Sequence, residues 1–304
     1  MTFTPADLKA RVPWPAKILA KLVLSRLPAS YSFWERLSLF KHGRMEDPGY
    51  AYGVFRRHFE RTPLNGRERP FVALELGPGD SLMSALVAKA HGASATYLMD
   101  VGRFARTDLE PYRAMAALLV EKGHAAPDLS GARTVDDILD ACDAHYFAEG
   151  LSSLRDLPDA SVDFAWSHAV LEHVRAGDMP ETMAQLRRVL RPDGVSSHCV
   201  DLKDHLAEAL NNLRFPERVW ESELMASSGF YTNRIRYRPM LELFTRAGFE
   251  VEVVEINRWP AAPTPTGRLW GPYRHLEEDD LLVSSFDAVL CPAREPPQPS
   301  TSHE

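Results

Sequence analysis

The sequence predicts a doubly wound α/β fold built on one mostly parallel sheet. Between residues 71 and 203, short apolar runs alternate with stretches of helical period, which is the pattern of βαβ units. A glycine-rich turn joins the first apolar run to a helical stretch. The composition, with 45% hydrophobic and 25% charged residues, is that of an ordinary folded globular chain.

Seven runs of apolar, β-branched and aromatic residues bounded by turn residues predict strands. They cover about residues 71–76, 95–100, 144–148, 162–167, 195–201, 250–256 and 282–291. Helices are expected between them at 81–91, 111–122, 134–143, 179–190 and 238–247. We expect Pro192 and Gly194 to end the fourth helix, and Gly248 to cap the fifth in a left-handed conformation.

The main domain is expected to span residues 69–292, with three additions. Residues 1–68 form a helical, aromatic-rich N-terminal extension that can serve as a second lid. Residues 204–236 are polar and aromatic with weak periodicity, which indicates a lid insertion over the substrate. Residues 293–304 are rich in proline, serine and charge, and we expect them to be disordered.

Charge and cysteine content exclude several classes of function. The net charge of −7 argues against a nucleic-acid partner bound through its phosphates. Three widely spaced cysteines indicate a reducing, cytoplasmic location without a disulfide framework. No apolar run is long enough to span a bilayer. Residues 14–28 have the pattern of a basic amphipathic helix, but we expect it to pack on its own domain rather than on a membrane.

A glycine turn and an acid indicate a nucleoside-type ligand. The first predicted strand carries Glu75 and runs into Gly77, Gly79 and Asp80, where glycines allow the backbone to approach a ligand closely. Asp100 ends the next strand, 21 residues after Gly79, where a carboxylate can accept hydrogen bonds from both ribose hydroxyls. Both features lie where ligands bind open α/β sheets.

The same turn argues against a nicotinamide dinucleotide. The dinucleotide fingerprint has a third glycine three residues after the second, and Leu82 stands there. Asp80 would also repel a pyrophosphate, whereas Glu75 and Asp80 are compatible with a cationic cofactor without phosphate.

Four segments give the chain a resemblance to the class I S-adenosylmethionine-dependent methyltransferases of small molecules. They are LELGPGDS (74–81), YLMD (97–100), LPDASVDFAWSHAVLEHV (157–174) and LRRVLRPDGV (186–195), in the order of the family. The resemblance covers about residues 70–292 and implies a Rossmann-like, seven-stranded sheet with an antiparallel last strand. It also implies S-adenosylmethionine as the cofactor and an enzymatic role in biosynthesis.

The resemblance assigns the cofactor-binding residues. Gly77 and Gly79 would line the methionine and ribose, Glu75 would support the loop beside Asp80, and Asp100 would hold the ribose. Further contacts would come from Val101 beside the adenine and from Ser167 and His168 at the methionine end. Many members carry an aspartate after the third strand that receives the adenine amino group. Here Glu149 is the nearest acid, so the backbone of Gly150 or Leu151 is the alternative.

The residues after the fifth strand are candidates for acid–base chemistry. His205 can act as general base with Asp201 as its orienting partner, and His198 lies nearby in the same segment. The alternatives are that these groups cap the next helix, or that they ligate a divalent cation, although the spacing is no established metal motif and we expect no metal. His173 either touches the substrate or packs over the cofactor pocket.

The predicted activity is methyl transfer to a small molecule, most readily to a hydroxyl of a sugar or specialised metabolite. The lid offers many donors and aromatic faces, namely Asn211, Asn212, Arg214, Trp220, Tyr231, Asn233 and Arg234. An amine or carboxylate acceptor, and a non-catalytic scaffold that only binds the cofactor, are the alternatives.

Overall fold

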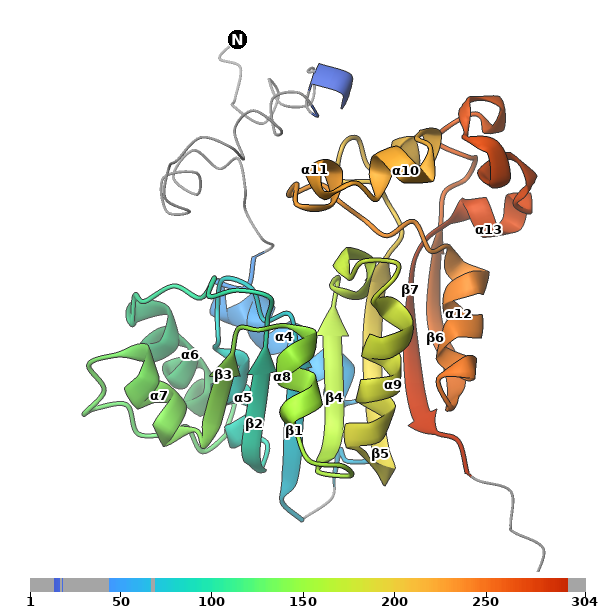
Figure 1. Ribbon diagram of the computed structural model, residues 1–304. Helices are drawn as coiled ribbons and strands as arrows, with labels where there is room; N and C mark the ends of the chain where they lie inside the picture. The colour runs from blue at the N-terminus through green and yellow to red at the C-terminus, as the bar shows by residue number, and fades with distance from the viewer. Residues whose placement is uncertain (1–13, 17, 19–43, 67–68, 295–304) are drawn as a thin grey trace, which may run out of the picture.

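The computed structural model describes residues 14–16, 18, 44–66 and 69–294, which centre on one seven-stranded sheet (Figure 1). The strand order is β3-β2-β1-β4-β5-β7-β6. In chain order the strands are β1 (Phe71–Leu76), β2 (Ala93–Met99), β3 (Ala144–Phe147), β4 (Val162–His168), β5 (Leu190–Asp201), β6 (Phe249–Arg258) and β7 (Val283–Pro292). The first five strands are parallel, and β7 lies antiparallel between β5 and β6. The predicted sheet is confirmed.

Helices cover both faces of the sheet, each over its own apolar core. One core joins α4 (Pro48–Phe59), α5 (Ser84–Ala90), α6 (Glu110–Glu121) and α7 (Val135–Ala141) to the sheet through residues such as Phe55 and Leu86. The other core joins α8 (Leu151–Asp156), α9 (Met179–Val189) and α12 (Tyr237–Arg246) through residues such as Met183 and Phe244. Because both faces of the sheet are buried, the central strands carry apolar side chains on both faces.

One predicted helix end is wrong, and another is confirmed. α9 ends at Val189, and Pro192 and Gly194 belong to β5 instead of ending the helix. The pairing of β4 with β5 shifts register at Val162–Phe164, and such an irregularity accommodates a proline in a strand. Gly248 follows α12 with a φ of +90°, which is the predicted left-handed cap.

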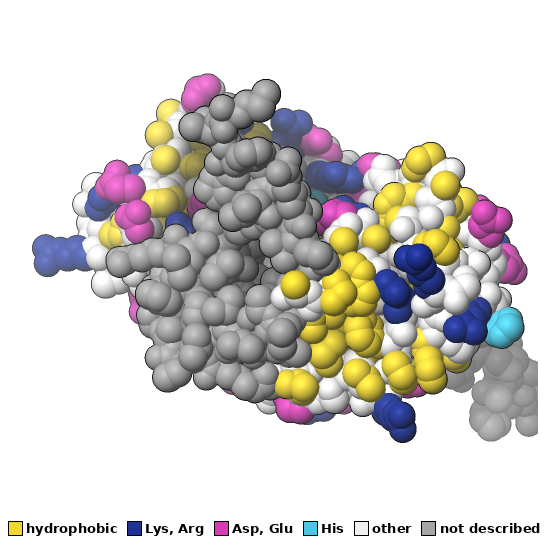
Figure 2. Space-filling model, turned by 90° about the horizontal axis from the view of Figure 1, so that it is seen from above, with side chains coloured by type: hydrophobic (Ala, Val, Ile, Leu, Met, Phe, Trp, Pro, Cys, Tyr) yellow, Lys and Arg dark blue, Asp and Glu magenta, His cyan; other side chains and the backbone are white. Residues whose placement is uncertain are grey.

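The lid (residues 204–236) lies above the carboxyl ends of the strands (Figure 1). It consists of the short elements η2 (Asn211–Arg214), α10 (Glu217–Trp220) and α11 (Glu223–Ala226). Its core includes Trp220, Phe230 and Tyr231. Seen from above, hydrophobic side chains gather on part of this face of the molecule (Figure 2). Within the lid, Val219 and Leu224 are exposed.

A second irregular segment, which the sequence pattern did not indicate, supports the lid. It holds η3 (Thr266–Arg268), η4 (Gly271–His275) and α13 (Glu278–Leu282). The Trp270 amide donates to the Leu213 carbonyl over 2.9 Å. Leu269 and Leu281 pack with Leu210 and Leu213 in a small core of their own. The lid is therefore fixed from the β6–β7 side.

Part of the predicted N-terminal extension is described and is helical. Asp47 caps α4 by accepting from the Gly49 and Tyr50 amides. The predicted amphipathic helix at 14–28 falls outside the described residues except for 14–16 and 18, and so does the predicted disordered tail from residue 295 onward. Within the described ranges, every helix is too short or too polar to cross a bilayer.

Candidate functional site

The glycine turn after β1 is shaped by two left-handed residues. Gly77 has a φ of +70° and Gly79 a φ of +67°, both costly for other residues. The Gly77 amide donates to the Met99 carbonyl of β2 over 2.7 Å. A Cβ at Gly77 would lie 2.5 Å and 2.7 Å from the two Cγ atoms of Val170, so the turn is packed tightly against the segment after β4. Only glycine fits this position without movement.

Asp100 joins the turn to the end of β2. Its Oδ2 accepts from the Gly79 amide over 3.0 Å, and its Oδ1 accepts from the Val101 amide over 2.7 Å. Both carboxylate oxygens of Asp100 thus accept from backbone amides at this edge of the sheet. The turn and the acid therefore lie side by side at one edge of the sheet.

An apolar surface extends this edge toward β3. Val101 is 79% exposed, and the Gly150 amide donates to the Asp100 carbonyl over 2.8 Å. A Cβ at Gly150, whose φ is +57°, would lie 3.1 Å from Val101. An exposed valine beside a glycine offers a flat surface to an aromatic ring. The Glu149 side chain forms a local contact, in which its Oε2 accepts from the Ser153 hydroxyl over 3.1 Å. Leu151 is the first residue of α8.

Glu75 supports the turn from inside. Its carboxylate accepts from the Ser84 hydroxyl and, over 3.2 Å, from the Trp166 indole. Burial raises its pKa from 4.5 to about 7, against the opposing effect of these two donors. Asp80 is also buried, and its carbonyl accepts from the Arg106 amide over 2.9 Å. Neither acid side chain lies at the surface of the pocket.

His198 is held within the sheet, which contradicts a catalytic role. It is completely buried, its Nδ1 lies 2.7 Å from the Ser167 hydroxyl, and its Nε2 lies 2.6 Å from the Ser196 hydroxyl. Burial lowers its pKa to about 3, so the ring stays neutral. With both nitrogens occupied and no exposed surface, the ring cannot receive a proton from an acceptor. The Ser167 hydroxyl is committed to the same network.

His168, the last residue of β4, belongs to a chain of polar groups from α4. Its Nδ1 lies 3.3 Å from His58 Nε2, and its Nε2 lies 3.5 Å from the Tyr50 hydroxyl. From His58 the chain of polar groups continues to Ser197, whose hydroxyl lies 2.8 Å from His58 Nδ1. Burial lowers the pKa of both histidines, so both are neutral at pH 7. The sequence pattern did not indicate Tyr50 or His58, because only the packing of α4 brings them here.

Beyond β4 and β5, four titratable residues form what we call the β4–β5 cluster: Glu172, His173, Asp201 and His205. Glu172 and His173 lie on η1 (Leu171–His173). The rings of His173 and His205 are stacked, with centroids 4.9 Å apart and an interplanar angle of 14°. Asp201 ends β5; its Oδ1 accepts from the Lys203 amide over 2.9 Å, and burial raises its pKa. Sequence reasoning singled out all of these except Glu172.

The lid positions this cluster through backbone contacts. The Asn233 amide donates to the Glu172 carbonyl over 2.7 Å, and the Asn233 side chain donates to the carbonyls of Leu171 and Val174. Asp204 is buried, and its carboxylate accepts from the amides of Leu206, Ala207 and Asn211. Asp204 therefore shapes the turn that carries His205 and is directed away from solvent.

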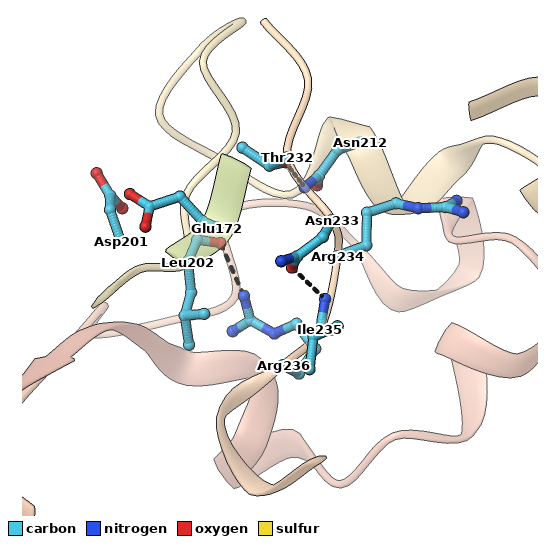
Figure 3. A pocket seen from close by; sticks show the side chains of 9 residues that line it. All are labelled: Glu172, Asp201, Leu202, Asn212, Thr232, Asn233, Arg234, Ile235 and Arg236. Carbon is cyan, nitrogen blue, oxygen red and sulfur yellow. Dashed lines mark hydrogen bonds between the residues drawn. The ribbon is translucent and has the colours of Figure 1, made fainter. Parts of the chain in front are cut away.

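A small cavity of about 10 Å³ lies beside the cluster and is lined by Glu172, Asp201 and residues 232–236 of the lid among others. Figure 3 shows these lining side chains. The arginines of the cavity are engaged elsewhere. Arg236 donates to the Leu202 carbonyl over 2.8 Å, and Arg234 donates to the Phe215 carbonyl and to Glu221. Asn212 donates to the Thr232 hydroxyl over 2.9 Å. Most of the donors expected to bind substrate thus hold the lid together instead.

Comparison with known proteins gives one family match. Residues 74–197 match a family model described as a methyltransferase domain. No curated protein gives a significant match.

Solved structures similar to the chain include three methyltransferases. One is an S-adenosylmethionine-dependent methyltransferase from Methanosarcina mazei, with 18% identity over 76% of this chain and 96% of that chain and a TM-score of 0.44. Another is the 1,6-didemethyltoxoflavin-N1-methyltransferase of Burkholderia thailandensis, with 17% identity over 97% and 92% and a TM-score of 0.43. A third comes from the Haloferax volcanii complex of the Trm112 activator and a putative methyltransferase, with 18% identity over 83% and 97% and a TM-score of 0.42.

The matched segment begins in β1 and ends in β5, so it contains the glycine turn, Asp100 and the β4 strand end. The antiparallel β7 completes the sheet that the resemblance implied. The chain contains a methyltransferase domain of the class I kind in residues 74–197, whose cofactor is S-adenosylmethionine.

Proposed function

We propose that the enzyme transfers the methyl group to a hydroxyl of a small polar molecule, such as a sugar or a specialised metabolite, bound beneath the lid. The observation that carries this proposal is the β4–β5 cluster, which gathers two carboxylates and two histidines at the edge of the sheet that also carries the glycine turn. A hydroxyl acceptor needs a group that takes its proton, and the cluster supplies such groups.

The cofactor lies along the glycine turn in this proposal. The ribose hydroxyls donate to the Asp100 carboxylate, which the Gly79 and Val101 amides hold at the end of β2. The adenine covers the exposed Val101 next to Gly150 and Leu151. The methionine end then lies beside the turn at Gly77, on the side that Val170 does not cover, because Val170 packs directly against Gly77. Glu75 and Asp80 support the loop from inside.

Methyl transfer requires alignment and the removal of one proton. The acceptor oxygen attacks the methyl carbon in line, the carbon–sulfur bond breaks, and its electron pair stays on sulfur. Asp201 is suited to receive the hydroxyl proton because burial raises its pKa and so makes it a stronger base than an exposed aspartate. His205, whose ring is stacked on that of His173, assists in the removal of this proton.

An acceptor screen with full-length protein tests this proposal. Methyl-labelled S-adenosylmethionine is incubated with a panel of sugars, phenols, amines and carboxylic acids, and the methylated atom is identified by mass spectrometry and NMR. We expect O-methyl products, with His205→Gln lowering turnover at least tenfold and leaving cofactor affinity within twofold. His145→Gln, an exposed histidine on β3, is the matched control and should behave as wild type.

Products methylated only on nitrogen or on carboxyl groups would contradict the hydroxyl assignment. Wild-type turnover in His205→Gln would contradict the role of the cluster.

A further inference from the structure

Three side chains of the β4–β5 cluster have the composition of a metal-ligand set. The ligand atoms of Glu172, His173 and His205 all lie within 4.8 Å of one another. Glu172 and His173 are adjacent on η1, and His205 approaches from the turn after β5. Two imidazoles and one carboxylate, with further positions left open, form a donor set that proteins use for divalent transition metals.

The Glu172 carboxylate forms no ion pair or side-chain hydrogen bond with the described residues. It is 2% exposed, and no described side chain donates to either of its carboxylate oxygens. The neighbouring arginines point at backbone carbonyls and at Glu221. A cation bound at Glu172 would compensate its buried charge.

The hydrogen bond of His173 prepares it as a ligand. Its Nδ1 lies 2.9 Å from the Tyr231 carbonyl oxygen, which only accepts, so Nδ1 carries the proton. The lone pair is then on Nε2. A backbone carbonyl that fixes the tautomer in this way is the usual outer partner of a metal-bound histidine.

The rings of His173 and His205 lie next to each other, with centroids 4.9 Å apart. Because a metal ion lies in the plane of each ring that binds it, one of the two stacked rings has to rotate about its side-chain torsions for both nitrogens to reach one ion. Asn233 and Asp204 hold the two backbone segments that carry these rings. The site is therefore supported by buried groups rather than by exposed loops.

We infer that Glu172, His173 and His205 bind one divalent first-row transition-metal ion, such as Zn²⁺. The two imidazole ligands favour this class over Mg²⁺ and Ca²⁺, which take oxygen ligands. The catalytic role of the ion rests on the proposed function. A bound acceptor hydroxyl would lose its proton more readily, the proton would pass to Asp201, and the oxygen would attack the methyl carbon.

Metal binding is tested without any acceptor. Full-length protein freed of metal with a chelator is titrated with Zn²⁺ alone in a calorimeter, and with Co²⁺ while the visible absorption is recorded. We expect one ion per chain and a Co²⁺ spectrum of low coordination number. Glu172→Gln and His173→Gln should each weaken binding at least tenfold, whereas the control His145→Gln should bind as wild type.

Equal affinity in wild type, Glu172→Gln and His173→Gln would overturn the inference, and so would the loss of binding in His145→Gln alone. Because His173 is exposed, its variant should keep the fold, which circular dichroism and S-adenosylhomocysteine binding verify. O-methylation without metal binding would overturn this site alone, while metal binding with methylation only on nitrogen would overturn the hydroxyl assignment alone.

Discussion

The substitution Gly77→Ala probes the packing of the cofactor turn. Two costs can be read from the structure. The left-handed φ of +70° disfavours alanine by roughly 1–2 kcal/mol. The added Cβ would lie 2.5 Å and 2.7 Å from the Cγ atoms of Val170, and such overpacking costs about 1–3 kcal/mol. We therefore expect Gly77→Ala to lower the free energy of unfolding by roughly 2–5 kcal/mol.

Two further variants separate these costs. Gly92 also has a positive φ, +96°, but a Cβ there meets nothing within 4 Å, so Gly92→Ala should cost only the roughly 1–2 kcal/mol of the backbone. Val170→Ala removes both Cγ atoms that the new Cβ would meet. In the double variant with Gly77→Ala we expect the clash to disappear, which gives a coupling energy of about 1–3 kcal/mol.

Urea unfolding followed by tryptophan fluorescence measures these free energies, and calorimetry measures S-adenosylhomocysteine affinity in the same variants. If Gly77→Ala costs no more than Gly92→Ala, or if Val170→Ala restores nothing, the turn is not packed against the β4 segment as described.

Two other predictions concern acids of the same pocket. Asp100→Asn should weaken cofactor binding about tenfold or more in calorimetry, since a hydrogen bond to a charged group contributes about 1.5–3 kcal/mol. Asp128→Asn, at an exposed aspartate, is the control. Equal cofactor affinity in the two variants would show that Asp100 does not bind the ribose. Burial raises the pKa of Glu75 from 4.5 to about 7, so in the folded state this carboxyl stays protonated to a higher pH than in the unfolded state. Its contribution to stability is therefore present below pH 4.5 and declines by about 3 kcal/mol up to pH 7. Glu172 and Asp201, whose pKa values are also raised by burial, remain in Glu75→Gln. Urea unfolding across this range should therefore show a decline about 3 kcal/mol larger in wild type than in Glu75→Gln, and parallel curves would refute it.

Much of the fold could be predicted because parallel strands place their carboxyl ends at one edge. This geometry alone brings the turn at Gly79 next to Asp100. Helix and strand ends were harder to predict, because a register shift in β5 lets a strand contain Pro192 and Gly194, which in isolation indicate a helix end.

The site was predicted less completely, for reasons of long-range packing. His198 looked reactive, but it lies on a strand covered on both faces, where two serines occupy its nitrogens. Tyr50 and His58 reach the edge of the sheet only through the docking of α4. The sequence of the lid contains many hydrogen-bond donors. Their acceptors, such as the carbonyl that accepts from Asn233, could not be predicted because they depend on the irregular backbone of the folded protein.

The central claim is that the turn after β1 and Asp100 form one pocket for S-adenosylmethionine. A crystal structure of the protein with S-adenosylhomocysteine tests it most directly. We expect both ribose hydroxyls within hydrogen-bond distance of the Asp100 carboxylate, the adenine against Val101, and the sulfur beside the turn at Gly77. A nucleoside bound elsewhere, or a ribose turned away from Asp100, would contradict the claim.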